Sequence, residues 1–365
     1  MFKNIGQKIK LRRAIQAGWN ALGYLEFRRH LEKDQKENQA TTKAEKKWAY
    51  DRGFYSDRIQ LYGLTDENWQ DYVNDREFHF AFPFNQPFDH WIDDKLTFYQ
   101  VLFPFRDHLP RYFYFIDQGG SYRNLCDLPA GIKGTPAGLL ELLRAEGDLA
   151  VKLFSGSEGV GFYRLSYTDA GGFTKNSVPL SEESLLKFVG SLKNYLVTEY
   201  LRPCAELAAI YPHTTNSIRL VVINEPGTKN PIFRGLIRFG SNASGEVDNT
   251  SQGAVFAIID TKTGTYSHGE QDVNHRRVKI DRHPDTGVQL AGQIPQWDAV
   301  CTLVRQMCAH LSLLTFMGFD IVISDRGIKV IEINSLPEIQ DYQLAGPLKK
   351  DPQFASFWAR QKKEI

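Results

Sequence analysis

Residues 318–337 read GFDIVISDRGIKVIEINSLP, and this stretch predicts a β-hairpin. Residues 319–324 and 328–334 are rich in β-branched and aromatic side chains. Asp325, Arg326 and Gly327 between them suit a three-residue turn with the glycine in the left-handed conformation. This turn pairs Ser324 with Ile328, and we work outward from that pair.

The register predicted by this turn places Asp320 opposite Glu332, and strand alternation places Val330, Glu332 and Asn334 on one face. Two carboxylates about 5 Å apart between Cβ atoms destabilise a sheet unless a positive charge neutralises them. Oxygen ligands from Asp, Glu and Asn suit a hard divalent cation, so we interpret Asp320, Glu332 and Asn334 as a magnesium site. The alternative is a solvated surface hairpin. The apolar opposite face argues against it, since that face consists of Ile321, Ile323, Ile331 and Ile333.

The composition is that of a soluble globular protein of 365 residues, long enough for two or three domains. Residues 1–47 hold twelve of the 44 Lys and Arg residues and five of the 43 Asp and Glu residues, so this arm carries +7 and the remainder −6. The four cysteines form no C-x-x-C pair. We expect a cytoplasmic protein, because no long apolar span or signal-peptide pattern is present.

A phosphate-binding element is expected where a buried strand, residues 149–154, contains Lys152. A buried lysine is costly without a partner, so this ammonium group is expected to point at an anion. The loop SGSEGVG follows at 155–161 and precedes another strand at 162–167. Such a flap offers backbone N–H groups to phosphates, although Gly-rich hairpins are common and this one matches neither the Walker nor the dinucleotide pattern.

Three arginines lie inside the predicted strands 217–223 and 232–240, namely Arg219, Arg234 and Arg238. Arginine among apolar residues needs an anionic partner, and phosphate or carboxylate oxygens match its planar fork. Salt bridges to Glu199 or Glu206 are the alternative for any one of them. The clearest helix is predicted at 297–317, with a buried stripe that includes Leu303, Met307 and Leu314.

The basic arm predicts one amphipathic helix over 2–38, with Leu11, Ile15, Trp19 and Leu22 on one stripe. Such a helix binds an anionic membrane surface, its own domain or a partner chain. Nucleic acid is not expected, because the rest of the chain is acidic and contains no recognised nucleic-acid motif. Aromatic residues crowd 48–88 and indicate the packing of a small domain. The sequence does not define the oligomeric state.

Several stretches together resemble the ATP-grasp superfamily, and within it the sugar-transfer-associated proteins of the capsule and teichuronopeptide type. Most of residues 54–340 takes part in the resemblance. The stretches are FYSDRIQLYGLT at 54–65, DDKLTFYQVL at 93–102, YLRPCAELAAIYPHTTNSIRLVV at 200–222, VDNTSQGAVFAIIDTKTG at 247–264, and the hairpin itself.

The resemblance implies an α+β ATP-grasp fold in which two α+β lobes grip a nucleotide, with an N-terminal helical and aromatic extension. It implies four parts, at 1–75, 76–130, 131–200 and 201–365, of which 131–200 is the lid and 201–365 carries the metal.

The resemblance also implies the site residues. Phosphates would be bound by Lys95, Lys152 and the flap residues Ser155, Gly156, Ser157 and Gly159, although Glu158 departs from the family pattern. Adenine or ribose would be held by Glu199, Tyr200 and Leu201, and Asn249 would lie in a polar loop near the substrate. Arg219, Arg238 and Lys152 would act in catalysis, and Asp320, Glu332 and Asn334 would bind Mg²⁺.

The activity implied is that of an ATP-dependent carboxylate–amine ligase that forms a C–N bond and releases ADP. The pathway expected is the synthesis of a cell-surface polysaccharide or a specialised metabolite. Two alternatives stay open: a kinase that phosphorylates a small-molecule hydroxyl on the same scaffold, and a non-catalytic ATP-binding protein.

Overall fold

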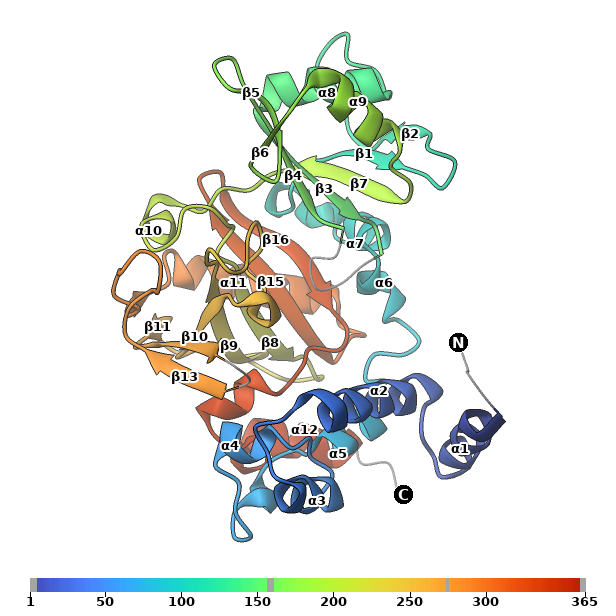
Figure 1. The fold of residues 1–365 in the computed structure, drawn as a ribbon, viewed down its shortest axis with the longest axis vertical. Coiled ribbons are helices and arrows are strands. Elements are labelled where there is room, and N and C mark those ends of the chain that lie inside the picture. The colour runs from blue at the N-terminus through green and yellow to red at the C-terminus, as the bar shows by residue number, and fades with distance from the viewer. Residues whose placement is uncertain (1–4, 156–160, 274–275, 362–365) are drawn as a thin grey trace.

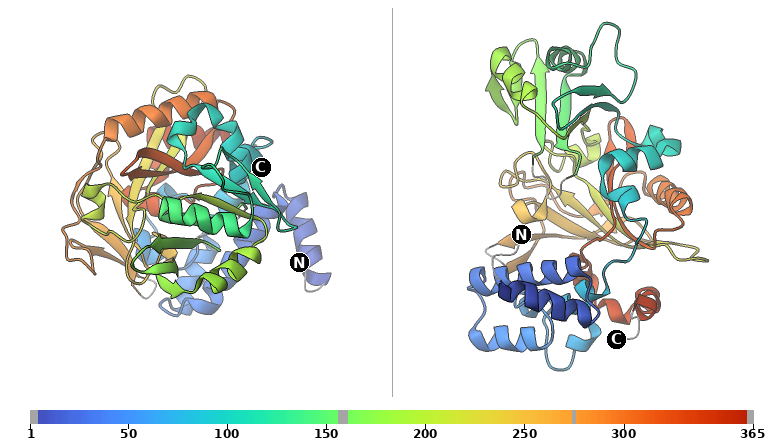
Figure 2. Two further views of the ribbon diagram at one scale, coloured as in Figure 1. Left: turned by 90° about the horizontal axis from the view of Figure 1, so that it is seen from above. Right: turned by 90° about the vertical axis from the view of Figure 1, so that its right-hand side faces the viewer.

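The computed structural model describes residues 5–155, 161–273 and 276–361, and the fold is α+β as expected. Three parts lie one above another in Figure 1: a sheet with two helices at the top, a second sheet in the middle, and a helical unit at the bottom. The view from the side in Figure 2 gives the same order. No helix among the described residues is both long and apolar enough to cross a membrane.

The first sheet has the strand order β2-β1-β7-β3-β4-β5-β6, and all of its pairs are antiparallel. Helices α8 and α9 pack on it through leucines that are fully buried. The expected boundary between 130 and 131 therefore falls inside one sheet, because β1 lies before it and pairs with β7, which follows it. The elements are β1 (Tyr112–Ile116), β2 (Tyr122–Asn124), α8 (Pro136–Glu146), β3 (Asp148–Leu153), β4 (Tyr163–Thr168), β5 (Gly172–Lys175), β6 (Val178–Leu180), α9 (Glu182–Gly190) and β7 (Tyr195–Glu199).

The second sheet has the order β13-β12-β10-β9-β8-β15-β16, again antiparallel. One face packs on α11 and α7 and the other on the C-terminal helix α12. The elements are α6 (His90–Asp93), α7 (Lys95–Val101), α10 (Ala205–Ala208), β8 (Ile218–Ile223), β9 (Ile232–Phe239), β10 (Val255–Ile259), β12 (Gly269–Val273), β13 (Arg276–Ile280), α11 (Trp297–His310), β15 (Phe316–Ser324), β16 (Gly327–Asn334) and α12 (Pro352–Gln361), with a small separate sheet of β11 (Thr265–Tyr266) and β14 (Gly292–Gln293).

The β15–β16 hairpin confirms the predicted pair Asp320↔Glu332, but its turn is shorter than expected. Ser324 pairs with Gly327 rather than Ile328, and a bulge between the pairs Ile321↔Val330 and Asp320↔Glu332 restores the register. Because the bulge adds one residue to β16, it reverses the side-chain alternation. Val330 therefore packs in the core with Ile333, and the prediction that Val330 shares the face of Glu332 is wrong.

The predicted helix 297–317 is also too long, because α11 ends at His310 and β15 begins at Phe316. The cause is a continuous apolar run that serves both elements: Leu311 and Leu314 are buried in the connection, and Met317 is buried in the strand. Periodicity alone does not mark such a change from helix to strand.

The N-terminal arm folds into two helices where the sequence predicts one over 2–38, and residues 2–4 of that range lie outside the described part. The chain turns at Gly18, whose φ is +87°, and the Asn20 side chain then caps the next helix by accepting from Leu22 N at 2.9 Å. The helices of the N-terminal unit are α1 (Ile5–Gln16), α2 (Ala21–Glu37), α3 (Lys43–Asp51), α4 (Arg58–Tyr62) and α5 (Asp75–Ala81). Along the chain as a whole, short 3₁₀ turns lie at Trp69–Asp71, Phe103–His108, Thr250–Gln252, Asp341–Ala345 and Leu348–Lys350.

The turn between α1 and α2 divides the apolar stripe that the sequence predicts for the arm. Trp19 packs against Phe80, with ring centroids 5.1 Å apart, whereas Ile15 and Leu22 are 48% and 54% exposed. Contact of the arm with a membrane surface or a partner chain stays a prediction.

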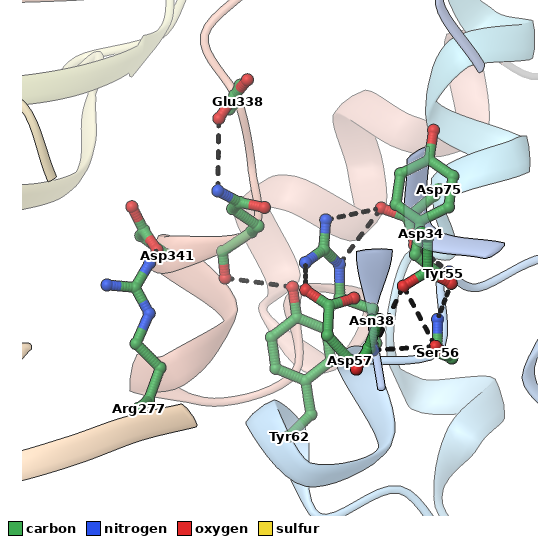
Figure 3. Close-up of polar contacts among 12 residues, drawn as sticks. Asp34, Asn38, Tyr55, Ser56, Asp57, Tyr62, Asp75, Arg277, Glu338 and Asp341 are labelled. Carbon is green, nitrogen blue, oxygen red and sulfur yellow. Dashed lines mark hydrogen bonds and ion pairs between the residues drawn. The ribbon is translucent and has the colours of Figure 1, made fainter. Parts of the chain in front are cut away.

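A buried arginine, Arg58, anchors the helical unit. Its partners Asp57 and Asp75 and the neighbouring Tyr62 are labelled in Figure 3. Arg58 donates from Nε and Nη2 to Asp75 Oδ1 at 3.2 and 3.1 Å, and from Nη1 to Asp57 Oδ2 at 2.6 Å. The neighbouring Tyr62 hydroxyl donates to the backbone oxygen of Gln340 at 3.1 Å. This bond joins the motif at 54–65 to the segment that follows β16.

One amide, Asn85, holds the start of β15 against the end of β16. Its Nδ2 donates to the backbone oxygens of Phe316 and Ser335, both at 2.7 Å, and its Oδ1 accepts from Thr315 N at 2.8 Å. We expect Asn85→Ala to lower the free energy of unfolding by about 3 kcal/mol, because buried backbone groups lose their partners. Urea unfolding measures the change. The side chain of exposed Asn230 accepts a single 3.4 Å bond, so Asn230→Ala is the control with a small effect. Similar losses in both variants would contradict the role of Asn85.

Candidate functional site

Three predicted site residues meet on neighbouring strands of the second sheet. Arg219 on β8 lies opposite Asp320 on β15 and donates to both of its carboxylate oxygens, from Nη2 to Oδ2 at 2.6 Å and from Nε to Oδ1. Arg238 on β9 donates to Asp320 Oδ1 at 3.0 Å and to Ser217 Oγ at 2.6 Å. Neither arginine pairs with Glu199 or Glu206, so the alternative of salt bridges to those residues does not describe them.

Asp320 is charged and well paired although it is only 4% exposed. Burial alone would raise the pKa of its carboxyl group, but the charges and hydrogen bonds of Arg219 and Arg238 outweigh burial and lower that pKa. The negative charge that faces Glu332 across the hairpin is thus balanced by protein side chains.

Glu332 has its own cation. Lys95 begins α7, whose N-terminus is capped by Asp94 through Leu96 N at 3.1 Å and Thr97 N at 2.8 Å. The Lys95 ammonium group is buried and donates to Glu332 Oε1 at 3.2 Å. The linker between the helical unit and the first sheet therefore contributes to the site.

Lys152 reaches the same place from the first sheet. It lies on β3 as predicted, and its Nζ is 5.9 Å from the centroid of the Tyr112 ring. No ion pair to it exists within the described ranges. Burial and, to a smaller extent, the charge of Lys95 lower the pKa of Lys152 to about 8, and the charge of Glu332 opposes both. The structure therefore brings Lys95, Lys152 and Glu332 together.

Two buried polar atoms beside these charges have no hydrogen-bond partner in the described part of the chain: Asn334 Nδ2 and the Tyr112 hydroxyl. Unsatisfied buried donors are uncommon in folded proteins and often mark a functional site. Sequence reasoning found Asn334 but missed Tyr112, because in the run YFYFI it has no signal that separates it from its neighbours.

The donor set suits a hard divalent cation in part. Glu332 has one cationic partner and Asn334 contributes an amide, so both fit the expected magnesium ligands. Asp320 fits only by sharing oxygens that already accept three hydrogen bonds from arginines. Within the described ranges, this site included, no group of three or more His, Cys, Asp or Glu residues is placed to hold a metal ion.

Glu199, predicted to hold adenine or ribose, lies at the end of β7 and has partners of its own. Its Oε1 accepts from Arg326 Nη1 at 2.6 Å and its Oε2 from the backbone N–H of Arg111 at 3.1 Å. Tyr200 is buried with the Arg164 guanidinium 4.5 Å from its ring centroid, and Leu201 is buried beside it. Arg326 was missed, because a turn arginine has no sequence signal for a partner in another sheet.

The remaining predicted residues lie at the margin of this cluster. Ser155 is exposed at the end of β3, while Gly156, Ser157 and Gly159 lie outside the described residues. Asn249 lies in a tight turn, where its backbone oxygen accepts from Gln252 N at 3.0 Å. The preceding Asp248 accepts from Ser217 N, next to the Arg238 contact.

Comparison with known proteins agrees with this geometry. The model of the family described as sugar-transfer associated ATP-grasp matches residues 79–349. No curated protein matches the chain.

Three solved structures illustrate the likeness. The ATP-grasp ligase PsnB, complexed with a minimal precursor, is 14% identical over 77% of this chain and 64% of its own, with a TM-score of 0.40. D-alanine–D-alanine ligase from Bacillus anthracis is 14% identical over 74% and 67%, with a TM-score of 0.38. The L-amino acid ligase from Bacillus licheniformis is 10% identical over 76% and 50%, with a TM-score of 0.40. This chain thus spans less than two thirds of PsnB.

The family model includes both sheets, the linker with Lys95 and the hairpin with Asp320 and Glu332. The ATP-grasp fold expected from the sequence is confirmed, and the chain belongs to the sugar-transfer associated ATP-grasp family.

Proposed function

We propose that this protein is an ATP-dependent carboxylate–amine ligase that acts through an acyl phosphate and releases ADP. The observation that carries the proposal is the charge of the cluster. Lys95, Lys152, Arg219 and Arg238 supply four positive charges against the two of Asp320 and Glu332. A net charge of +2 among partly buried side chains favours a polyanion such as the phosphates of ATP.

In this proposal, Lys95 and Lys152 bind the phosphates from two sides. Lys152 has no carboxylate partner within the described ranges, so it is available to a ligand, whereas Lys95 exchanges Glu332 for phosphate oxygens or shares both. The flap residues Ser155, Gly156, Ser157 and Gly159 cover the phosphates. Adenine and ribose lie near Glu199 and the backbone of Tyr200 and Leu201.

The reaction has two balanced steps. A substrate carboxylate oxygen attacks the γ-phosphorus and ADP leaves, giving an acyl phosphate. An amine then attacks the acyl carbon, inorganic phosphate leaves, and the nitrogen loses a proton as the amide forms. Arg219 and Arg238 stabilise the charge that develops on the transferred group, held in place by Asp320, while Asn249 lines the substrate side.

Glu332 and Asn334 would hold Mg²⁺, with Asp320 as a shared third ligand. The ion would offset the charge on the transferred phosphoryl oxygens. We assign the reaction to the cytoplasmic synthesis of a cell-surface polysaccharide or a specialised metabolite, which agrees with the association of the family with sugar transfer.

We expect Lys152→Ala and Glu332→Ala each to abolish ATP turnover while the protein stays folded, because each removes a charge from the phosphate end of the site. The wild type is incubated with ATP, Mg²⁺ and mixtures of amino acids and amines, and products are identified by mass spectrometry. A new amide with ADP and phosphate supports the ligase, whereas phosphate retained on an acceptor hydroxyl would identify a kinase. Turnover that persists in the folded double variant would contradict the site.

The two acids of the hairpin differ in their expected effect on stability. We expect Asp320→Asn to lower the free energy of unfolding by about 3 to 5 kcal/mol, because it leaves two buried arginines without their counter-charge. Glu332→Gln is expected to cost only about 1 kcal/mol, because the Glu332 side chain is 28% exposed and the glutamine amide oxygen can still accept from Lys95. Chemical unfolding compares them, and equal losses would refute the division into a structural and a ligand-binding acid.

Nucleotide affinity is expected to depend on pH through Lys152. The pKa of about 8 means that the ammonium form, which attracts phosphate, is lost as pH rises above that value. The affinity for ADP should then fall by up to about tenfold per pH unit between pH 8 and 9. Lys152→Arg keeps its charge and should flatten this dependence. Calorimetric titrations with ADP at pH 7, 8 and 9 test this expectation. If ADP affinity falls equally with pH in the wild type and in Lys152→Arg, Lys152 is excluded as the cause.

A further inference from the structure

The side chain of Tyr112, the first residue of β1, packs in the core of the second sheet although β1 belongs to the first. Tyr112 pairs with Thr198 and Tyr114 with Val197, so β1 has one residue more than β7 across this stretch. In a regular strand, Tyr112 and Tyr114 would point to the same face. The bulge separates them: Tyr114 packs in the core of the first sheet, and Tyr112 packs in the core of the second. Bulges that redirect a side chain are frequent next to active sites.

The ring of Tyr112 is fully buried and stacks on Tyr99, with centroids 4.4 Å apart. Phenylalanine would make the same contact. The hydroxyl adds a buried polar atom that has no hydrogen-bond partner among the described residues. An unpaired buried hydroxyl costs roughly 1 to 3 kcal/mol, so packing gives no reason for a tyrosine here.

Charged side chains lie near the ring of Tyr112. Lys152 Nζ lies 5.9 Å from the ring centroid. Burial raises the pKa of Tyr112, and the negative charge of Glu332 raises it further. The phenol therefore stays protonated and is a hydrogen-bond donor beside the residues to which we assign the phosphates.

A second unsatisfied donor lies on the same strand as Glu332. Asn334 is two residues beyond Glu332 on β16, and its buried Nδ2 also lacks a partner in the described part of the chain. The two groups share one requirement, an acceptor oxygen that the protein does not supply. With Lys95 and Lys152 nearby, the matching acceptor is an anion.

We propose that the Tyr112 hydroxyl donates a hydrogen bond to an oxygen of the β- or γ-phosphate of the bound nucleotide. The inference rests on the proposed function and adds to it a neutral donor that distinguishes polyphosphates from a nucleoside monophosphate. The buried hydroxyl reduces the stability of the ligand-free protein and increases the affinity for the ligand.

The test is Tyr112→Phe in the full-length protein, which removes one oxygen and keeps the ring. We expect the ligand-free variant to unfold at the same temperature as the wild type or higher, since a buried unpaired group is gone. Its affinity for ADP and ATP, measured calorimetrically with MgCl₂, should fall roughly ten- to hundredfold, the range for a hydrogen bond to a charged group. Its affinity for AMP should not change.

Tyr114→Phe is the matched control, two residues along the same strand. The Tyr114 hydroxyl donates to the backbone oxygen of Lys133 at 3.1 Å, so its removal should lower the unfolding temperature and leave ADP affinity unchanged. Wild-type ADP affinity in Tyr112→Phe, or an equal loss for AMP, would overturn the inference and leave the proposed function standing. A wild-type protein that binds neither ADP nor ATP would overturn both.

Discussion

The ion pair of Asp320 with Arg219 and Arg238 is the interaction on which the site depends. It lies in the middle of the second sheet and joins three adjacent strands through charged side chains that are largely buried. Each of these charged groups loses hydration when it is buried, and only the ion pair with the others compensates for that loss. Because the two guanidinium groups balance Asp320, Glu332 opposite it needs only Lys95. The positive charge of Lys152 is then left for a ligand.

The sequence was sufficient for the elements that carry this cluster, since strands with alternating apolar residues and charged exceptions identified β3, β8, β9, β15 and β16. The Asp320↔Glu332 pair was predicted correctly for an incomplete reason. The prediction assumed a three-residue turn and a regular ladder, whereas the hairpin has a shorter turn and a bulge, and the two differences cancel at this pair. They do not cancel at Val330, which packs in the core instead of lying on the face of Glu332 as predicted.

What the sequence did not reveal depends on contacts between distant segments. The charge argument for a metal assumed that no protein cation was near Asp320, yet Arg219 and Arg238 lie 101 and 82 residues away in sequence and meet it only across the sheet. The orientation of Tyr112 depends on a bulge, and periodicity assumes that bulges are absent. Arg326 finds Glu199 at a separation of 127 residues. Pairs of side chains from different sheets are not separated by any regular sequence interval, so a periodic pattern cannot reveal them.

The hairpin also joins the two sheets. Its tip carries Arg326, which is bound to Glu199 at the end of β7, and the chain that leaves β7 runs along it, with Cys204 N donating to Ile323 O at 2.8 Å. Its open end carries Glu332 and Asn334. One continuous ladder thus connects the predicted adenine side of the site with the predicted phosphate side. Because Lys152 lies on β3, whose neighbour β7 ends at Glu199, a movement of the first sheet about this tip would shift the ammonium group relative to Glu332. The geometry of the proposed phosphate site therefore depends on how the first sheet sits on the hairpin.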